Sequence, residues 1–281
     1  MSRIETRFAH LREAGRAALV PYVMTGDPSP DSTVAIMHAL VSAGADMVEL
    51  GMPFSDPVAD GAVIQAAGER ALAAGQRLED TLQAVRQFRD RDGETPVILM
   101  GYLNPVEIMG SERFVAAAAE AGVDGVLLVD SPPEESAELA PRLREAGLDM
   151  IFLVAPTTSE ARRARIGQLA SGFVYYVSLK GVTGAGGLDA AAVAGSLDGL
   201  RRHTDLPLGV GFGIRDAQTA AAVGQFADAV IIGSSLVARL HEAARNGQDP
   251  AEAAGEFMRP LREAIDGARG ADIAKKEMAQ Q

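Results

Sequence analysis

A single (β/α)8 barrel, the TIM barrel, is the α/β fold class that three features of the sequence predict. Short apolar segments, each followed by a turn signal and a helical pattern, recur eight times in about 250 residues. The chain has 281 residues, of which 47% are hydrophobic, and this is enough to bury one large core. No linker or change of composition divides it. We therefore expect one domain over residues 1–281, and a doubly wound sheet is the weaker alternative because it rarely needs eight in-line repeats.

The predicted strands are apolar runs that end in turn-forming residues. They comprise residues 18–24, 46–50, 96–101, 125–129, 149–154, 173–177, 207–211 and 228–232. Before them, residues 3–13 place apolar side chains at helical spacing, which predicts an extra N-terminal helix. Asp31 is expected to cap the next helix, which runs to about Ala43. The C-terminal tail from about residue 270 is expected to be poorly ordered.

Composition and charge exclude several classes of function. The chain has no Cys, which rules out disulfides, thiolate catalysis and zinc–thiolate sites, and its four His show no metal-ligand spacing. We therefore expect no metal. A net charge of -12 argues against nucleic acid or an anionic membrane as partner. Because the first residues show no signal pattern and no apolar run reaches ~18 residues, we expect a cytoplasmic protein.

The second strand carries the residues around which we expect the active site to form. Alternation along this strand places Glu49 on the face opposite Val48 and Leu50, so Glu49 is an interior carboxylate if both faces are buried. An unpartnered buried charge is costly, so such a group usually has a partner or a function. The loop that follows is rich in Pro and Gly and carries Asp56 and Asp60. Catalytic groups of (β/α)8 barrels lie at these strand ends and loops.

The loops after the last three strands are rich in small residues. After strand 6, residues 178–187 contain four glycines, which favours a mobile lid. Strands 7 and 8 end in segments that let backbone N–H groups approach an anion, and the second opens into a short helix. The predicted phosphate-binding residues are Gly213, Gly233, Ser234 and Ser235.

Several of these segments together resemble the tryptophan synthase α-subunit family. The run Glu49-Leu50-Gly51-x-Pro53-Phe54-Ser55-Asp56-Pro57-x-Ala59-Asp60-Gly61-x-x-Ile64-Gln65 is similar to the signature of that family. Shorter motifs occur in the family's order: Gly26-Asp27-Pro28, Tyr102-x-Asn104-Pro105, Gly181-Val182-Thr183-Gly184, Gly211-Phe212-Gly213-Ile214 and Gly233-Ser234. The resemblance spans residues 21–235. Ala62, Arg215 and Tyr22 depart from it, standing where many members have Pro, Ser and Phe.

The resemblance implies a lyase that cleaves indole-3-glycerol phosphate to indole and glyceraldehyde 3-phosphate, in the last stage of tryptophan biosynthesis. The reaction needs a proton delivered to the ring carbon, a proton removed from the chain hydroxyl, and stabilisation of positive charge at the ring nitrogen. Glu49, whose pKa we expect to be raised in the barrel, would move both protons. Asp60, on a more polar loop, would stay ionised opposite the ring N–H. Tyr175 is the third catalytic candidate.

The resemblance also implies a substrate pocket and a partner. The expected indole-pocket residues are Tyr22, Met100, Leu127, Leu153, Phe212 and Thr183, and Gly184 joins the phosphate-binding residues. The family's β subunit carries pyridoxal phosphate and forms an αββα heterotetramer with the α subunit. We therefore expect no cofactor in this chain, and we expect Asp56, Asn104 and Pro105 among the contacts with a β subunit.

Three alternatives remain open. The first is a stand-alone indole-3-glycerol phosphate lyase, and the second is a Schiff-base aldolase that acts through Lys180. The third is a noncatalytic phosphate-binding regulatory subunit. Lys180 lies in the Gly-rich loop after strand 6, whereas a Schiff-base lysine requires rigid, desolvated placement. The presence of both Glu49 and Asp60 speaks against a pure binding role.

Overall fold

The computed structural model describes residues 1–177, 189–211 and 213–279, with side chains as far as Arg269. The predicted lid at 178–188, with Lys180, Thr183 and Gly184, lies outside the described residues, as does Phe212. The prediction for the tail after about residue 270 stays a prediction.

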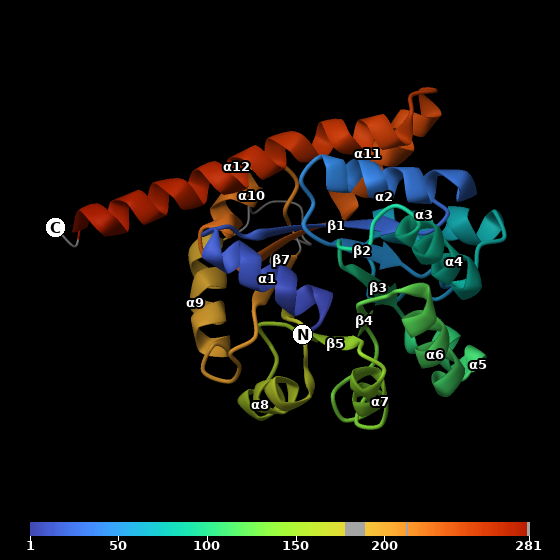
Figure 1. Ribbon diagram of the computed structural model, residues 1–281, viewed down its shortest axis with the longest axis horizontal. Coiled ribbons are helices and arrows are strands. Elements are labelled where there is room, and N and C mark those ends of the chain that lie inside the picture. The colour runs from blue at the N-terminus through green and yellow to red at the C-terminus, as the bar shows by residue number, and fades with distance from the viewer. Residues whose placement is uncertain (178–188, 212, 280–281) are drawn as a thin grey trace.

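Eight parallel strands form a closed barrel in chain order, and β8 pairs back with β1 (Figure 1). The strands are β1 (Ala18–Met24), β2 (Val48–Gly51), β3 (Val97–Gly101), β4 (Gly125–Leu128), β5 (Asp149–Val154), β6 (Val174–Val177), β7 (Leu208–Gly211) and β8 (Ala229–Ile232). Parallel neighbours require crossover connections, which the helices around the barrel supply. The predicted (β/α)8 fold is confirmed, and so is the position of each predicted strand.

Helices pack around the barrel, and one of them, the N-terminal helix, covers its N-terminal end (Figure 1). They are α1 (Arg3–Glu13), α2 (Thr33–Ser42), α3 (Ala62–Ala73), α4 (Leu78–Arg89), α5 (Leu103–Met109), α6 (Ser111–Ala121), α7 (Leu139–Glu145), α8 (Glu160–Leu169), α9 (Ala190–Leu200), α10 (Ala217–Gly224), α11 (Ser234–Arg245) and α12 (Pro250–Ala279), with the 3-10 helix η1 (Pro30–Ser32). The helix expected after strand 8 is α11. The long helix α12 packs on α2, α10 and α11 and extends past the barrel. Within the described part of the chain, no helix is long and apolar enough to span a membrane.

The start of α2 differs from the prediction. Asp31 lies inside η1, and the residue that precedes α2 is Ser32, so Asp31 is not the cap of that helix. Pro30 at the first position of η1 accounts for the difference, because its fixed φ and missing N–H suit the first helical turn. Helical structure therefore begins before Asp31.

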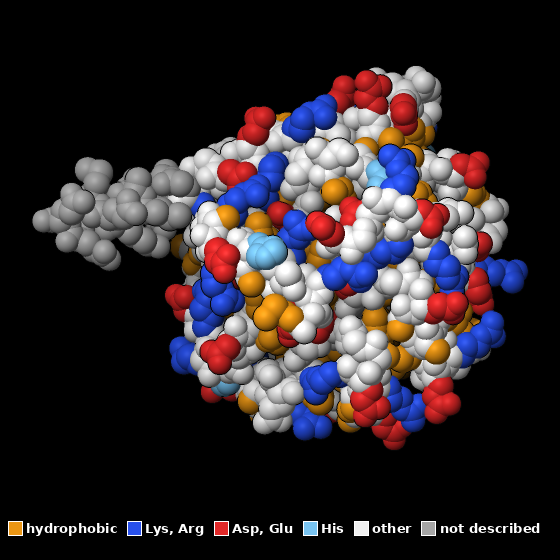
Figure 2. Space-filling view, viewed as in Figure 1, with side chains coloured by type: hydrophobic (Ala, Val, Ile, Leu, Met, Phe, Trp, Pro, Cys, Tyr) orange, Lys and Arg blue, Asp and Glu red, His pale blue; other side chains and the backbone are white. Residues whose placement is uncertain are grey.

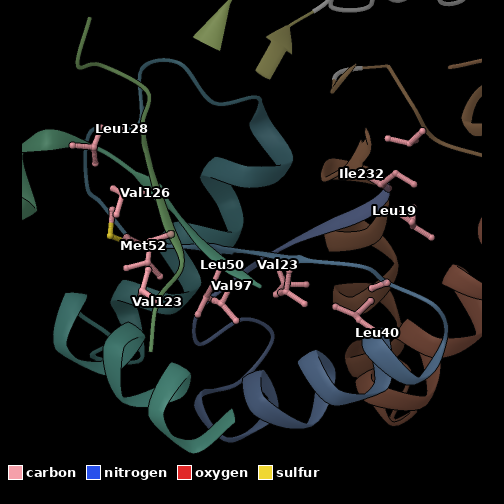
Figure 3. Packing of buried hydrophobic residues seen from close by; sticks show 14 of the residues in the cluster. Leu19, Val23, Leu40, Leu50, Met52, Val97, Val123, Val126, Leu128 and Ile232 are labelled. Atoms are coloured by element: carbon pink, nitrogen blue, oxygen red, sulfur yellow. The ribbon is translucent and has the colours of Figure 1, made fainter. Parts of the chain in front are cut away.

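Strand alternation divides the core into two layers. Val48 and Leu50 of β2 point outward and join the large apolar layer between strands and helices, part of which Figure 3 shows. Met47, on the other face, belongs to the apolar cluster inside the barrel. Both faces of β2 are therefore buried, which is the condition under which Glu49 becomes an interior carboxylate.

The N-terminal helix α1 closes one end of the barrel. Its buried residues Ile4, Phe8 and Leu11 belong to the same interior cluster as Phe173, whose ring centroid lies 5.9 Å from that of Phe8. Ser2 forms a capping box at the start of this helix and fixes its first turn. Apolar side chains thus fill the N-terminal end of the barrel. A ligand can therefore bind only at the C-terminal end.

Candidate active site

A cavity of about 140 Å³ lies at the C-terminal ends of the strands. It is lined by Tyr22, Glu49, Asp60, Gly61, Ile64, Met100, Tyr175, Gly213, Ile214, Ile231, Gly233 and Ser234. These residues come from β1, β2, β3, β6 and β8 and from the segments that follow β2, β7 and β8. The fold thus brings together residues that are far apart in the sequence, including the carboxylates Glu49 and Asp60, the three pocket or catalytic candidates Tyr22, Met100 and Tyr175, and three of the small residues expected to bind phosphate.

Other predicted site residues do not line this cavity. Leu127 is fully buried in the interior cluster and fills the core, and the half-buried Leu153 packs against the same cluster. Ser235 is half-buried, and its hydroxyl donates a hydrogen bond to the carbonyl of Ile214 at 3.3 Å. That hydroxyl is therefore already engaged with the protein.

Glu49 is buried without a hydrogen-bond partner. Its side chain is 1% exposed, and neither carboxylate oxygen has a partner among the described residues. Burial, and after it the charge of Asp60, raises the pKa of Glu49 from the ordinary 4.5 to about 8. Glu49 therefore keeps its proton at neutral pH, which is the direction that the sequence analysis expected.

Asp60 faces the same cavity from the loop between β2 and α3. Burial raises its pKa from the ordinary 3.8 to about 6, while a hydrogen bond with the Tyr102 side chain opposes the rise. Its surroundings are less polar than expected, because Tyr22, Ile64 and Met100 line the cavity beside it. Near pH 7 the cavity holds one protonated and one ionised carboxyl, since environment separates the two pKa values.

Hydrogen bonds hold the loop that carries Asp60. The side-chain amide of Gln65 donates to the carbonyls of Asp60 at 2.9 Å and of Pro57 at 3.3 Å. The N–H of Asp60 donates to the Pro57 carbonyl at 3.0 Å. The N–H of Ala59 donates to the hydroxyl of Tyr102 at 3.1 Å. The position of Asp60 is therefore set by several contacts along a short stretch of chain.

Two tyrosines extend over glycines of the neighbouring strand. A Cβ atom built on Gly51 would lie 2.2 Å from the hydroxyl oxygen of Tyr22, and one on Gly211 would lie 2.1 Å from that of Tyr175. Any side chain at either glycine would displace a hydroxyl from the site. Burial raises the pKa of both phenols, so both hydroxyls are neutral and available as hydrogen-bond donors.

The small residues after β7 and β8 that line the cavity are suited to binding an anion. Gly213 has a φ of 79°, a left-handed conformation that favours glycine. Gly233 directly precedes α11 and Ser234 begins it, and no side chain caps this helix. The first N–H groups of α11 are therefore placed to bind an anion at the cavity. Arg215 is exposed and is not among the lining residues.

A larger groove of about 540 Å³ lies outside the barrel, between α3 and α11. Of the basic residues that line it, Arg70 is paired with Asp27, its Nε lying 2.6 Å from Oδ1. We assign the site to the smaller cavity because it contains the unpaired, buried carboxyl of Glu49. Among the described residues, no cluster of three or more acidic or His side chains is arranged to hold a metal ion.

The sequence analysis missed several residues at the site. Gly61, Ile64, Ile214 and Ile231 line the cavity, and Tyr102 contacts Asp60. A signal existed for four of them. Gly61 and Ile64 are part of the longest motif, and Ile214 ends the motif after strand 7. Tyr102 opens another motif directly after strand 3, where a barrel places functional residues.

The residues expected to contact a partner lie near this end of the barrel but outside the cavity. Asp56 and Asn104 are exposed, and Pro105 is half-buried in α5. Two large apolar residues in the same segments are also exposed, Val58 by 85% and Ile108 by 80%. Their role as contacts stays a prediction. On the face that Figure 2 shows, acidic and basic side chains are interspersed.

Comparisons with known proteins identify the family. Residues 8–266 match the family model described as tryptophan synthase alpha chain. The chain is 60% identical over 266 residues to the tryptophan synthase alpha chain of Thioalkalivibrio sulfidiphilus (strain HL-EbGR7), with 95% of this chain and 100% of that relative covered.

Solved structures agree with this result. Tryptophan synthase subunit alpha from Legionella pneumophila str. Paris has a TM-score of 0.90 and 46% identity, and 95% of this chain and 99% of that chain are covered. The aminoacrylate-bound form of tryptophan synthase from M. tuberculosis has a TM-score of 0.84 and 34% identity, with 94% and 100% covered. The chain belongs to the tryptophan synthase alpha chain family.

Proposed function

We propose that this chain cleaves indole-3-glycerol phosphate to indole and glyceraldehyde 3-phosphate as the α subunit of a tryptophan synthase. Family membership supports the reaction. The observation that carries the mechanism is the buried and unpartnered Glu49 with a pKa of about 8, in one cavity with Asp60, whose pKa is about 6. One cavity then offers a proton donor and an anion at neutral pH.

Glu49 is the proposed acid and base. Its carboxyl group donates a proton to the ring carbon that carries the glycerol phosphate chain, and the ring becomes a cation. The resulting carboxylate removes the proton of the hydroxyl on the adjacent chain carbon. The bond between ring and chain then breaks, an aldehyde forms, and the electron pair returns to the ring as indole. Glu49 ends the cycle protonated, so protons and electrons balance.

Asp60 is the proposed stabiliser of the cation. When the ring carbon gains its proton, positive charge develops at the ring nitrogen, and an ionised carboxylate opposite that N–H lowers the energy of the transition state. A pKa of about 6 leaves Asp60 mostly ionised at pH 7 and above. Tyr175, whose neutral hydroxyl lies in the same cavity, is the third proposed catalytic residue.

The rest of the cavity is proposed to bind the two ends of the substrate. Tyr22, Ile64, Met100 and Ile231 provide apolar surface for the indole ring. The phosphate would be bound by Gly213, Gly233, Ser234 and the first N–H groups of α11. Ser235, in the same first turn of α11, remains a further proposed phosphate-binding residue. Thr183, Gly184 and Phe212 keep the roles that the resemblance implies, as proposals only.

The proposed partner is a tryptophan synthase β subunit, in an αββα heterotetramer in which the β subunit holds pyridoxal phosphate and this chain holds no cofactor. Exposed apolar side chains often mark an interaction surface, and Val58 and Ile108 accompany the proposed contacts Asp56, Asn104 and Pro105. We further propose that residues 1–281 form one domain and that the protein acts in the cytoplasm.

One assay tests the proposed reaction. The purified protein is incubated with indole-3-glycerol phosphate, with and without an added β subunit, and indole and glyceraldehyde 3-phosphate are measured. Indole formation that rises when the β subunit is present is the expected result. Full activity without a β subunit would favour a stand-alone lyase. Loss of activity after borohydride treatment with substrate would favour a Schiff base at Lys180, and no indole under any condition would favour a binding role.

A further inference from the structure

Tyr102 has no part in the mechanism above, although it touches one of its carboxylates. It lies between the end of β3 and the start of α5, and it is 3% exposed. Its side chain forms a hydrogen bond with the Asp60 side chain, and its hydroxyl oxygen accepts the N–H of Ala59 at 3.1 Å. The hydroxyl thus contacts two successive residues of the loop after β2.

The hydrogen-bond directions are determined by the chemistry of the groups. A phenol has one O–H to donate, and its oxygen also accepts. Since the Ala59 N–H already donates to that oxygen, the phenol is free to donate its own proton to the Asp60 carboxylate. An ionised carboxylate only accepts, so the pair is complementary when Asp60 is charged.

The ring of Tyr102 contacts a second aromatic ring, and a hydrogen bond holds the backbone that follows it. Its centroid lies 5.2 Å from that of Phe54, which belongs to the same loop as Asp60. The chain beyond it is held because the N–H of Leu103 donates to the Asp130 side chain at 2.8 Å. The end of β3 therefore gives the hydroxyl a fixed position, against which the Asp60 loop rests.

We propose that Tyr102 is a positioning residue for the reaction, and that its hydroxyl holds the Asp60 carboxylate in its catalytic place and charge state. The proposal rests on the proposed function of Asp60. The hydrogen bond favours the ionised form, while burial alone would favour the protonated form, so the hydroxyl keeps the pKa of Asp60 from rising further. Glu49 shows the contrasting case, a carboxyl in the same cavity that has no such donor.

The variant Tyr102→Phe removes the hydroxyl and leaves the ring on Phe54. Titration of the free protein by ¹³C NMR, with labelled Asp carboxyl carbons and Asp60→Asn for assignment, should give a higher pKa for Asp60 than in the parent. The acid limb of kcat/KM, which reports the free protein, should move to higher pH by the same amount. On that limb kcat/KM falls about tenfold for each unit of the shift, whereas it should approach the parent value between the two limbs.

Tyr176→Phe is the matched control, because Tyr176 is a buried tyrosine of β6 in the outer layer of the core. It should leave both the pKa of Asp60 and the acid limb in place. A second variant, Phe54→Leu, keeps the hydroxyl and should shift the acid limb less than Tyr102→Phe does.

An unchanged pKa of Asp60 in Tyr102→Phe would overturn the proposal, and so would a loss of kcat/KM that is equal at every pH or a failure of this variant to fold. Because the titration needs no substrate, it tests the Tyr102–Asp60 pair even if the parent produces no indole. A parent that produces no indole would contradict the proposed function instead.

Discussion

Two buried carboxyl groups, Asp46 at the N-terminal end of the barrel and Glu49 at the C-terminal end, have opposite surroundings. At the N-terminal end, the Asp46 carboxylate accepts the N–H of Leu19 at 2.8 Å and lies 2.9 Å from Nη1 of Arg262. At the C-terminal end, the equally buried Glu49 has no partner among the described residues. The comparison separates two uses of a carboxylate: a paired one contributes to the stability of the fold, and an unpaired one keeps its proton and is available for chemistry.

The N-terminal end repeats one arrangement around the barrel. In each alternate strand, an N–H group at the first or second position donates to a side chain that lies next to the start of the following strand. The pairs are Leu19 with Asp46 at 2.8 Å, Val97 with Asp124 at 2.8 Å, Met150 with Ser171 at 3.0 Å, and Leu208 with Asp228 at 2.9 Å. Three of the four acceptors are carboxylates. These carboxylates therefore order strand ends, a role that Glu49 does not have.

The largest expected effect is on catalysis at the C-terminal end. Glu49→Gln keeps the shape of the side chain but removes the transferable proton, so kcat for indole formation should fall by ~10²–10⁴-fold. Thermal unfolding monitored by circular dichroism should show no loss of stability, because no hydrogen bond of Glu49 is broken. Near-normal turnover of this variant would contradict the assigned role.

The corresponding change at the N-terminal end should affect stability alone. Asp124 lies 2.9 Å from Nη1 of Arg3 and 2.6 Å from Nη2 of Arg89, so Asp124→Ala leaves a largely buried guanidinium without its partner. The free energy of unfolding should fall by about 3–5 kcal/mol, with kcat of the folded protein unchanged. Urea denaturation measures the loss. As a control, Asp198→Ala, which breaks an exposed pair with Arg201, should cost less than about 1 kcal/mol.

A third prediction concerns the dependence of stability on pH. Glu49 releases its proton near 4.5 in the unfolded chain and near 8 in the folded protein, so between these values the folded state holds one proton more. Its contribution to the free energy of unfolding therefore falls as the pH rises from about 5 to about 8, by a few kcal/mol at most. Urea denaturation at several pH values should show this slope in the parent and a smaller one in Glu49→Gln. Equal slopes would mean that Glu49 ionises normally.

The smallest expected effect is at the phosphate end of the cavity. Gly213→Val places a branched side chain at a positive φ beside the proposed phosphate position, so KM for the substrate should rise more than kcat falls. Binding of a substrate analogue without phosphate should be nearly insensitive to the change. Equal losses of affinity for both ligands would argue against phosphate contact at Gly213.

The sequence predicts the barrel and its interior carboxylate because both follow from local periodicity. A strand with two buried faces is recognisable from its own residues, and its pattern identifies Glu49 as an interior carboxylate. Contacts between loops are not local. Tyr102 and Ala59 lie 43 positions apart, and nothing in either segment indicates that they touch. Leu127 is a predicted indole-pocket residue that instead fills the core. An inward-facing strand residue can do either, and the depth of the cavity, which local sequence does not indicate, decides between them.

The central claim is that Glu49 is protonated in the resting protein at neutral pH while the carboxylates at the N-terminal end are engaged in hydrogen bonds and ion pairs. Infrared difference spectroscopy of the parent against Glu49→Gln, recorded at a series of pH values, measures this directly. We expect a carbonyl stretching band of a protonated carboxylic acid that is present at pH 6, absent from the variant, and lost with a midpoint near pH 8. A band that is already lost near pH 4.5, the ordinary value for Glu, would contradict it.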